Sequence, residues 1–372
     1  MNSRMRCAAA ASAASVLVVS LSACGGVLSG DDSDSSAPVR KGNDVKIGLL
    51  LPEKETARYE KFDHPIIKRQ VSELTEGEGQ LVYANAGNDA GLQNKQLEKM
   101  IEGKVDALIV DPVDAKLISA SVQKAKDAGI HVIAYDRLAE GPVDAYVGFD
   151  NEHVGQTQAR ELVAALGDEA GKSSKIVMIN GSPTDPNAAG FKAGARAALS
   201  SVTIAKSYDT EGWKPENAKA HMEQAISSIG ASDIAGVYSA NDGMAGGAVQ
   251  ALKEAGLTEL PPITGQDAEL AAVQRILTGD QYMTVYKPYS DEAATAAEMA
   301  VRIAQGRNIE FESLAPDKTD SPTTKNVRTA SVRVVALTQD NIKETVVKDG
   351  FFKVSEICTP KYAAACAEAG LK

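Results

Sequence analysis

The sequence is poor in aromatic residues, in cysteine and in positive charge. Aromatic residues make up 5% of the 372 positions, and there is a single tryptophan, Trp213. The 50 acidic residues outnumber the 39 basic ones, which gives a formal net charge of −11. Because nucleic-acid binding requires a basic face, this balance argues against a nucleic-acid partner. With 44% hydrophobic residues, the chain is long and apolar enough for two domains that each bury a core.

The motifs of common enzyme classes are also missing. The four histidines are scattered, and no H-E-x-x-H pattern joins them. No G-x-S-x-G elbow is present. The glycines of "GMAGGA", residues 243–248, follow a predicted strand but lack the spacing and the Lys-Ser/Thr pair of a phosphate loop. We interpret them as sites of close helix packing. The sequence therefore predicts no catalytic residue, no metal site and no cofactor, and it does not favour an enzyme.

Long apolar runs are absent beyond the N-terminal region. There, Arg4 and Arg6 precede an alanine-rich apolar run that leads to the tetrad Leu-Ser-Ala-Cys at residues 21–24. This order predicts a lipoprotein signal peptide over residues 1–23 and a diacylglycerol on the thiol of Cys24. A plain signal peptide with an accidental cysteine is the alternative. Residues 24–44, rich in serine and aspartate, predict a flexible tether, so we expect the protein at the outer face of the cell membrane.

Two of the four cysteines lie in that N-terminal region, which leaves Cys358 and Cys366. Outside the cytoplasm, an even remaining pair favours a disulfide. Two free thiols are the alternative. A metal site is less favoured because no histidine lies near either cysteine in the sequence.

From Val45 onward, short apolar runs alternate with amphipathic segments. Runs such as "VKIGLLL", "VDALIVD", "IHVIAYD", "KIVMING" and "PPITGQD" are typical of strands buried on both faces, and segments with helical spacing separate them. This alternation predicts parallel sheets covered by helices. The units are too numerous for one open sheet of ordinary size, so two doubly wound lobes are favoured over a closed barrel.

Polar side chains end nearly every predicted strand. Ligands of open α/β sheets bind in the crevice at the carboxyl ends of the strands, so the set predicts a polar cleft. A solvated ion pair at one strand end is the plainer interpretation of Asp136 and Arg137 taken alone. The strand-end residues are Asp111, Asp136, Arg137, Asp150, Asn151, Ser182, Asp185, Asn187, Asn241, Asp242, Asp267 and Lys287.

Six motifs, in this order, closely resemble the xylose-binding branch of the bacterial sugar-binding proteins. They are "AYDR" (134–137), "GSPTDPNA" (181–188), "GWKPENA" (212–218), "SANDGMAGGAVQAL" (239–252), "TGQDAEL" (264–270) and "TVYKP" (284–288). The resemblance extends from Val45 to the C-terminus. It implies the type I periplasmic binding protein fold, in which two α/β lobes joined by three crossovers close on a monosaccharide.

The resemblance also implies which residues contact the sugar. Carried over motif by motif, they are Arg58, Tyr59, Asp136, Arg137, Asp185, Asn187, Trp213, Asn241, Asp267 and Lys287. The chain departs from the family's usual pattern at Tyr59, where xylose-binding members usually have tryptophan. The preceding "LPEKETA" also differs from the usual Asp-rich loop, which leaves the identity of the sugar open.

The chemistry of these side chains suits a sugar independently of the resemblance. Charged and amide groups make strong, directional hydrogen bonds with vicinal hydroxyls, and Trp213, with Tyr59 opposite, would cover the apolar ring faces. Three of the residues have plainer interpretations as well: Trp213 as core packing, Asp267 as a helix N-cap and Lys287 as a solvated strand end.

We expect lobe 1 to comprise residues 45–149 and 287–325, and lobe 2 to comprise residues 150–286 and 326–372. The expected protein is a monomeric, lipid-anchored receptor that delivers D-xylose or a related aldose to the permease subunits of an ABC importer. A sugar sensor that presents the closed lobes to a membrane signalling partner is the alternative. A cytoplasmic repressor built on the same lobes does not fit, because the sequence has a secretory signal and no DNA-binding headpiece.

Overall fold

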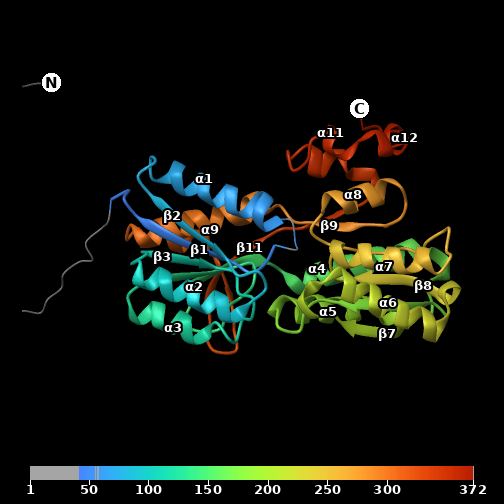
Figure 1. Ribbon diagram of the computed structural model, residues 1–372, viewed down its shortest axis with the longest axis horizontal. Coiled ribbons are helices and arrows are strands. Elements are labelled where there is room, and N and C mark those ends of the chain that lie inside the picture. The colour runs from blue at the N-terminus through green and yellow to red at the C-terminus, as the bar shows by residue number, and fades with distance from the viewer. Residues whose placement is uncertain (1–41, 55, 57, 372) are drawn as a thin grey trace, which may run out of the picture. The chain divides into compact units, whose positions relative to one another are not determined.

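The computed structural model describes residues 42–54, 56 and 58–371, which form two α/β lobes (Figure 1). The signal peptide expected over residues 1–23 and most of the expected tether, Cys24 included, lie outside the described residues. Within the described part of the chain, no helix has both the length and the apolar character needed to cross a membrane.

The first lobe is built on a seven-stranded sheet with the order β10-β11-β5-β4-β3-β1-β2. All neighbouring strands are parallel except β10, which is antiparallel to β11. The strands are β1 (Lys46–Leu51), β2 (Gln80–Asn85), β3 (Ala107–Val110), β4 (His131–Tyr135), β5 (Ala145–Phe149), β10 (Asp317–Thr319) and β11 (Val327–Val332).

Helices cover both faces of this sheet, as Figure 1 shows for α1 and α9 on one side and α2 and α3 on the other. Successive strand residues point to opposite faces. In β1, Leu49 packs with α1 and α9, whereas Leu50 packs with α2 and α3. This is why the strands read as continuous apolar runs. The helices of this lobe are η1 (Tyr59–Asp63), α1 (His64–Leu74), α2 (Ala90–Glu102), α3 (Ser119–Asp127), α9 (Tyr289–Ala304) and α10 (Asn308–Leu314).

The second lobe contains a parallel three-stranded sheet with the order β7-β6-β8, and a separate antiparallel pair, β9 and β12. Two isolated bridges, Val237 to Ile263 and Gln266 to Val285, connect the two parts. The strand expected in "PPITGQD" is thus reduced to these bridges. The strands are β6 (Lys175–Asn180), β7 (Thr203–Asp209), β8 (Ile234–Ser239), β9 (Thr284–Tyr286) and β12 (Val335–Leu337).

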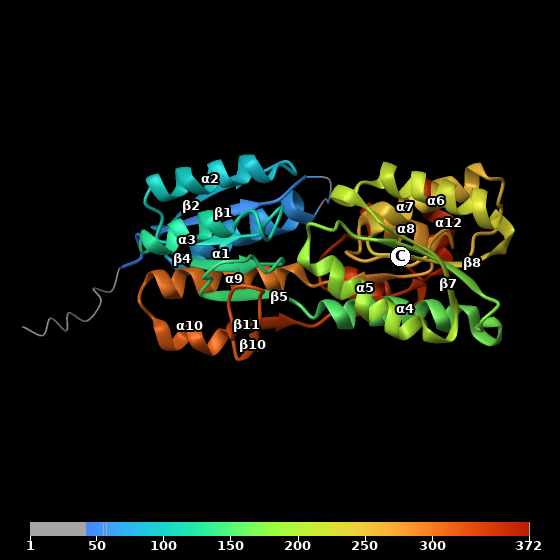
Figure 2. The same ribbon diagram turned by 90° about the horizontal axis from the view of Figure 1, so that it is seen from below.

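The helices of the second lobe pack in close pairs, α4 with α5 and α6 with α7 (Figure 2). A Cβ on Gly247 of α7 would lie 2.3 Å from the carbonyl oxygen of Pro215 at the start of α6, so only glycine allows this approach. The expectation that the glycines of "GMAGGA" serve close helix packing is therefore confirmed at Gly247. The helices are α4 (Asn151–Leu166), α5 (Pro186–Ala198), α6 (Pro215–Ile229), α7 (Asp242–Glu254), α8 (Leu270–Leu277), α11 (Val354–Ile357) and α12 (Ala363–Glu368).

Short helical turns join these elements and extend the C-terminal region. Cys358 and Cys366 of that region form a disulfide. The turns are η2 (Gly167–Glu169), η3 (Leu199–Ser201), η4 (Glu211–Trp213), η5 (Ala231–Asp233), η6 (Gln339–Asn341), η7 (Lys343–Val347) and η8 (Pro360–Tyr362).

The chain passes between the lobes after β5, after β9 and after β11. One expected boundary needs correction. The sequence predicts residues 326–372 in lobe 2, but β11 pairs in parallel with β5, with Ala330 opposite Val147, and belongs to the first sheet. The third crossing therefore lies between β11 and β12, at residues 333–334. The sequence of β11, Val-Arg-Thr-Ala-Ser-Val, does not favour either sheet, so only strand pairing decides its place.

Candidate functional site

A cavity lies between the lobes, at the carboxyl ends of the strands. The space within it that atoms do not fill is about 320 Å³, including its opening. All ten residues expected to contact a sugar line it, and none is more than 8% exposed. The lining residues are Thr56, Arg58, Tyr59, Asp136, Arg137, Asp185, Asn187, Phe191, Trp213, Asn241, Gln266, Asp267 and Lys287.

Three lining residues were not predicted from the sequence. Gln266 directly precedes Asp267 at the end of a strand-like segment, so the strand-end pattern could have found it. Thr56 lies in the loop after β1, where the resemblance pointed only to Arg58 and Tyr59. Phe191 lies one turn inside α5, and the sequence gives no sign that this buried aromatic faces a ligand rather than the core.

Three cavity residues have a left-handed backbone. The φ angles are +54° at Asp136, +60° at Trp213 and +93° at Asp267. Side-chain-bearing residues rarely adopt such angles, and those that do cluster at functional sites, where the surrounding structure imposes them. The backbone therefore turns these three side chains toward the cavity at a conformational cost.

Arg58 is the centre of a buried charge cluster in the first lobe. Its Nε pairs with Asp63 Oδ2 at 2.8 Å, its Nη1 with Asp136 Oδ2 at 2.7 Å, and its Nη2 with Glu292 Oε2 at 2.6 Å. Nη2 also donates to the hydroxyl of Tyr135 at 3.3 Å. These bonds use four of the five N–H groups of the guanidinium, so one on Nη1 is left without an assigned acceptor among the described residues. Arg58 thus serves mainly to fix Asp136.

The carboxyl groups around Arg58 have opposite pKa shifts. Burial raises the pKa of Glu292 well above its usual value, even though Arg58 opposes the shift. Burial also raises the pKa of Asp63, to about 6, against the attraction of Arg58. For Asp136, burial acts in the same direction, but Arg58, Lys287 and Arg137 outweigh it and lower the pKa. Asp136 is therefore the carboxylate that stays ionised at the cavity wall, and it accepts hydrogen bonds there.

Arg137 connects the two lobes. Its Nε lies 2.8 Å from Asp185 Oδ2 in the second lobe, and its Nη1 donates to the carbonyl of Pro112 at 3.1 Å. Nη2 donates to the hydroxyl of Tyr59 at 3.4 Å. Beneath it, Asp111 is fully buried, and within the described residues neither of its carboxylate oxygens has a hydrogen-bond partner. Burial raises the pKa of Asp111, and the positive charge of Arg137 partly opposes this rise.

The second-lobe wall is held by helix N-termini. Asp185 caps α5 by accepting from the backbone N–H of Asn187 at 2.8 Å, and Asn241 caps α7 by accepting from that of Met244 at 2.9 Å. Asp185 also accepts from the indole N–H of Trp213 at 3.1 Å. Asn187 reaches across the lobes, and its amide donates to Asp136 Oδ1 at 3.0 Å. These polar side chains therefore both end a helix and face the cavity.

Lys287 and Asp267 complete the lining. Lys287 Nζ lies 3.2 Å from Asp267 Oδ1, and 5.1 and 5.3 Å from the ring centroids of Phe149 and Phe191. Lys287 is 3% exposed, so it is not a solvated strand end. Asp267 does not cap α8, whose N-cap position is Glu269.

The lining pairs three acids with three bases and adds three aromatic rings. Because the charges are matched inside the cavity, it does not require an ionic ligand. The remaining donors and acceptors fit a neutral, hydroxyl-rich molecule, and Tyr59, Phe191 and Trp213 offer apolar surface to its C–H faces.

Comparison with known proteins identifies the family of the chain. A periplasmic binding protein domain matches residues 47–308. The chain belongs to the periplasmic binding protein family. It is 37% identical to the D-xylose-binding periplasmic protein of Escherichia coli (strain K12) over 321 residues, which is 84% of this chain and 93% of the relative. The D-xylose-binding periplasmic protein of Haemophilus influenzae is 35% identical over 316 residues, covering 83% and 90%.

Solved structures agree with this assignment. An ABC transporter solute-binding protein from Clostridium phytofermentans with bound β-D-glucose superposes with a TM-score of 0.77 at 26% identity, covering 84% of this chain and 99% of that one. The type I periplasmic binding protein fold and the membership of the xylose-binding branch, both expected from the six motifs, are confirmed. The comparisons also agree with the expectation that the chain is not an enzyme, because the family consists of binding proteins.

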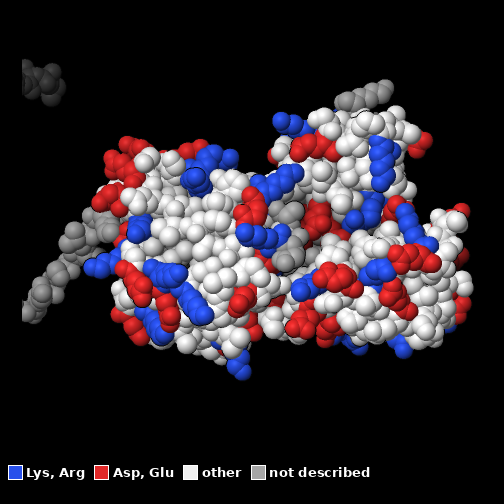
Figure 3. All heavy atoms as spheres, viewed as in Figure 1, with Lys and Arg blue, Asp and Glu red and all other residues white. Residues whose placement is uncertain are grey.

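On the face seen in Figure 3, lysine and arginine side chains are interspersed with aspartate and glutamate. Among the residues that the structure describes, no cluster of three His, Cys, Asp or Glu side chains has the arrangement of a metal site. In the described part of the chain, buried charged side chains gather in the network around the cavity between the lobes.

Proposed function

We propose that the protein is an extracytoplasmic receptor that binds one monosaccharide, D-xylose or a related aldose, between its lobes and delivers it to an ABC importer. The observation that carries this proposal is the small cavity in which three buried acids and three buried bases are matched and three aromatic rings add apolar faces. The relatives named for D-xylose and the neighbour with bound β-D-glucose support an aldose as the ligand.

The ten lining residues predicted from the sequence are proposed as the sugar contacts. The two unassigned N–H groups of Arg137 and the one of Arg58 are suited to donate to vicinal hydroxyls, whereas Asp136 and Asp267 are suited to accept. Trp213 and Tyr59 are proposed to cover the ring faces. Tyr59 gives a smaller plate than tryptophan, so the cavity is expected to accept a six-carbon aldose such as D-glucose as well.

A thermal-shift panel tests the ligand class. Purified protein is heated with D-xylose, D-glucose, D-ribose or myo-inositol, each at millimolar concentration. A ligand that binds only the folded state stabilises it by RT ln(1 + [L]/Kd). A sugar that binds therefore gives a higher melting temperature than the sugars that do not bind. We expect D-xylose or D-glucose to do so, with Asp136→Ala as the control that shows no shift. A panel in which no aldose raises the melting temperature would contradict the proposal.

Closure of the lobes on the sugar is the second part of the proposal. The three crossings, after β5, β9 and β11, permit a hinge motion in which few residues change conformation. A sugar that contacts Asp136 in one lobe and Asn241 in the other binds the closed form better, and this difference shifts the population. Small-angle scattering should give a smaller radius of gyration with saturating sugar. An unchanged curve would contradict ligand-driven closure.

We also propose that the receptor is monomeric and held at the membrane by a lipid on Cys24. Support comes from the sequence, in which the tetrad at residues 21–24 follows an apolar run and precedes a Ser/Asp-rich segment. In the native host, Cys24→Ser should release the protein from the membrane fraction, whereas Cys7→Ser should leave it there. Membrane retention of the Cys24→Ser protein would rule out the anchor.

A further inference from the structure

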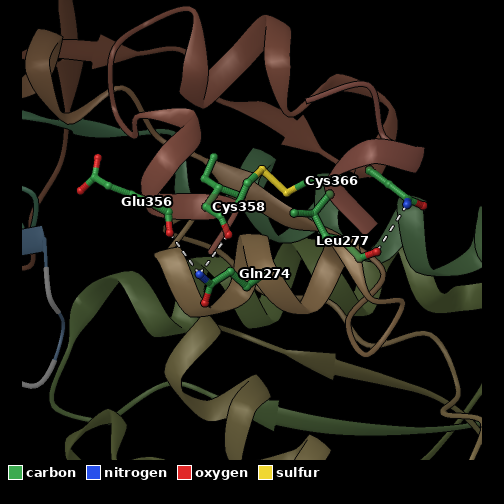
Figure 4. Close-up of a disulfide and its surroundings, with 7 residues drawn as sticks. Gln274, Leu277, Glu356, Cys358 and Cys366 are labelled. Atoms are coloured by element: carbon green, nitrogen blue, oxygen red, sulfur yellow. Dashed lines mark hydrogen bonds between the residues drawn. A yellow bond between two sulfur atoms is a disulfide. The ribbon is translucent and has the colours of Figure 1, made fainter. Parts of the chain in front are cut away.

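The C-terminal segment, residues 348–371, is fastened to α8 of the second lobe. The disulfide between Cys358 and Cys366 closes it, and the side-chain amide of Gln274 in α8 donates to the carbonyls of Glu356 and Ile357 at 3.3 and 3.2 Å (Figure 4). Ile357 and Cys366 are buried in one apolar cluster with Val273, Ile276 and Leu277 of α8. The segment is therefore part of the second lobe.

The same segment also contacts the first lobe, through η1. The ring of Phe351 stacks on that of Phe62, with 4.0 Å between centroids and 12° between planes. Beside this pair, Lys61 Nζ lies 4.3 Å from the ring centroid of Phe352 and 3.7 Å from Glu356 Oε1. The helix that carries Phe62 directly follows Arg58 and begins with Tyr59, a lining residue of the cavity.

A continuous set of ring contacts leads from Phe351 to the cavity. Tyr289, fully buried at the start of α9, has its ring centroid 5.5 Å from that of Phe351 and 6.1 Å from that of Phe62. The guanidinium of Arg58 lies 3.8 Å above the ring of Tyr289. The hydroxyl of Tyr289 donates to the carbonyl of Asp267 at 3.0 Å, so this tyrosine touches two residues that line the cavity.

We propose that Phe351 is a positioning residue of the sugar site, through which the disulfide-closed C-terminal segment contributes to affinity without touching the sugar. Stacked on Phe62 and against Tyr289, it joins the lobes beside the cavity and keeps Arg58 in place over Tyr289. Contacts that join the lobes favour the closed form, and a ligand that binds this form gains apparent affinity as its population rises. The inference rests on the proposed function and assigns it a further residue.

Calorimetric titration with D-xylose compares three variants. Phe351→Ala removes the stacked ring, and its expected effect is a dissociation constant about 3- to 10-fold higher, the range for aromatic pairs. Phe351→Tyr keeps the ring and should restore near-wild-type affinity. Tyr362→Ala is the matched control: it removes a half-buried aromatic of the same segment that packs on the apolar cluster of the second lobe and, among the described residues, has a cation–π contact with Lys361 and no stacked ring. It should lower stability but leave affinity within twofold.

Trp213 provides a second measurement that does not require a sugar. It is the only tryptophan, and it lies in the cavity with 8% exposure, so acrylamide quenching of its fluorescence reports access to the space between the lobes. In the free protein, quenching should be stronger for Phe351→Ala than for wild type, Phe351→Tyr and Tyr362→Ala. If wild type binds no aldose, the proposed function fails, and the quenching series still tests the coupling. Equal quenching in all four proteins, or equal affinity of wild type and Phe351→Ala, overturns the inference.

Discussion

The two walls of the cavity hold their polar side chains in different ways. In the first lobe, Arg58 and Asp136 are fixed by other buried charges, with Asp63 and Glu292 behind them. In the second lobe, Asp185 and Asn241 are fixed by the backbone N–H groups at the starts of α5 and α7. The first wall therefore depends on a network of side chains alone, whereas Asp185 and Asn241 of the second wall are also held by helix ends that the fold supplies in any case.

This difference predicts unequal consequences of mutation. A buried ion whose partner is removed is left unpaired in a poorly solvated site, which costs several kcal/mol. The loss of a helix N-cap side chain costs about 1 kcal/mol. Substitutions in the first wall should therefore affect sugar binding most, and those in the second wall should divide their effect between binding and stability.

The largest effect is expected from Asp136→Ala. The substitution removes the carboxylate that pairs with Arg58 and accepts from the cross-lobe amide of Asn187, and truncating a buried charge pair at a binding site costs on the order of 2–5 kcal/mol. Affinity for the best sugar, measured by calorimetry, should fall at least about 30-fold, and Arg137→Ala should behave alike. Asp233→Ala, which breaks an exposed ion pair with Lys175, is the control and should bind within twofold. Wild-type affinity in Asp136→Ala would show that the charge network is not part of the site.

The second wall is tested by two substitutions at one position. Asn241→Ala removes both the amide that faces the cavity and the cap of α7. We expect about tenfold weaker sugar binding and about 1 kcal/mol lower stability. Asn241→Ser retains a cap oxygen, so it should lose affinity while its melting temperature stays near wild type. If both variants lose the same stability, the capping and binding roles of Asn241 are not separable.

Buried or half-buried acids lie behind both walls, and they make stability depend on pH. Burial raises the pKa of Asp63 to about 6, that of Asp242 to about 7 and that of Glu269 to about 8. Their unfolded values lie near 4, so between pH 4 and 8 the folded chain binds more protons than the unfolded chain. The free energy of unfolding should therefore fall as pH rises through this range.

Urea unfolding at pH 6 and pH 8.5 measures this dependence. We expect a free energy of unfolding lower by about 1 kcal/mol or more at the higher pH. Asp242→Asn removes the titrating group beneath the second wall and should reduce the difference, whereas Asp233→Asn at the surface should not. A free energy that rises with pH in the wild type would mean that these carboxyls are ionised in the folded protein.

The smallest effect is expected at the rim of the cavity. The amide of Asn88 in the first lobe donates to the carbonyl of Gly212 in the second at 3.3 Å, and Asn88 has a φ of +66°. Asn88→Gly suits this backbone and removes only the bond between the lobes, which is half-exposed. Sugar affinity should change by less than about threefold. A larger loss would indicate that rim contacts, and not the buried walls, control closure.

Much of the site could be predicted from the sequence because it depends on local patterns. Strands that are apolar throughout must be buried on both faces, and parallel strands place their carboxyl ends on one edge. The polar residues that follow those strands, such as Asp136 and Asn241, therefore come together in one crevice. Arg58 and Tyr59 do not end a strand, and only the resemblance to a family identified them. No sequence pattern identifies Phe191, because an apolar helix residue that faces a ligand has the same sequence pattern as one that faces the core.

The sequence by itself determined the alternation of strands and helices, the chemistry of the strand ends and the pair of cysteines left for a disulfide. The tertiary structure decided the pairing of β11 with the first sheet, the cluster of Asp63, Asp136 and Glu292 around Arg58, and the stacking of Phe351 on Phe62. Glu292 is 234 positions from Arg58 along the chain, and Phe351 is still farther from Phe62. Propensity and periodicity act over a few residues, whereas such contacts arise only when two lobes of separate sequence are packed together.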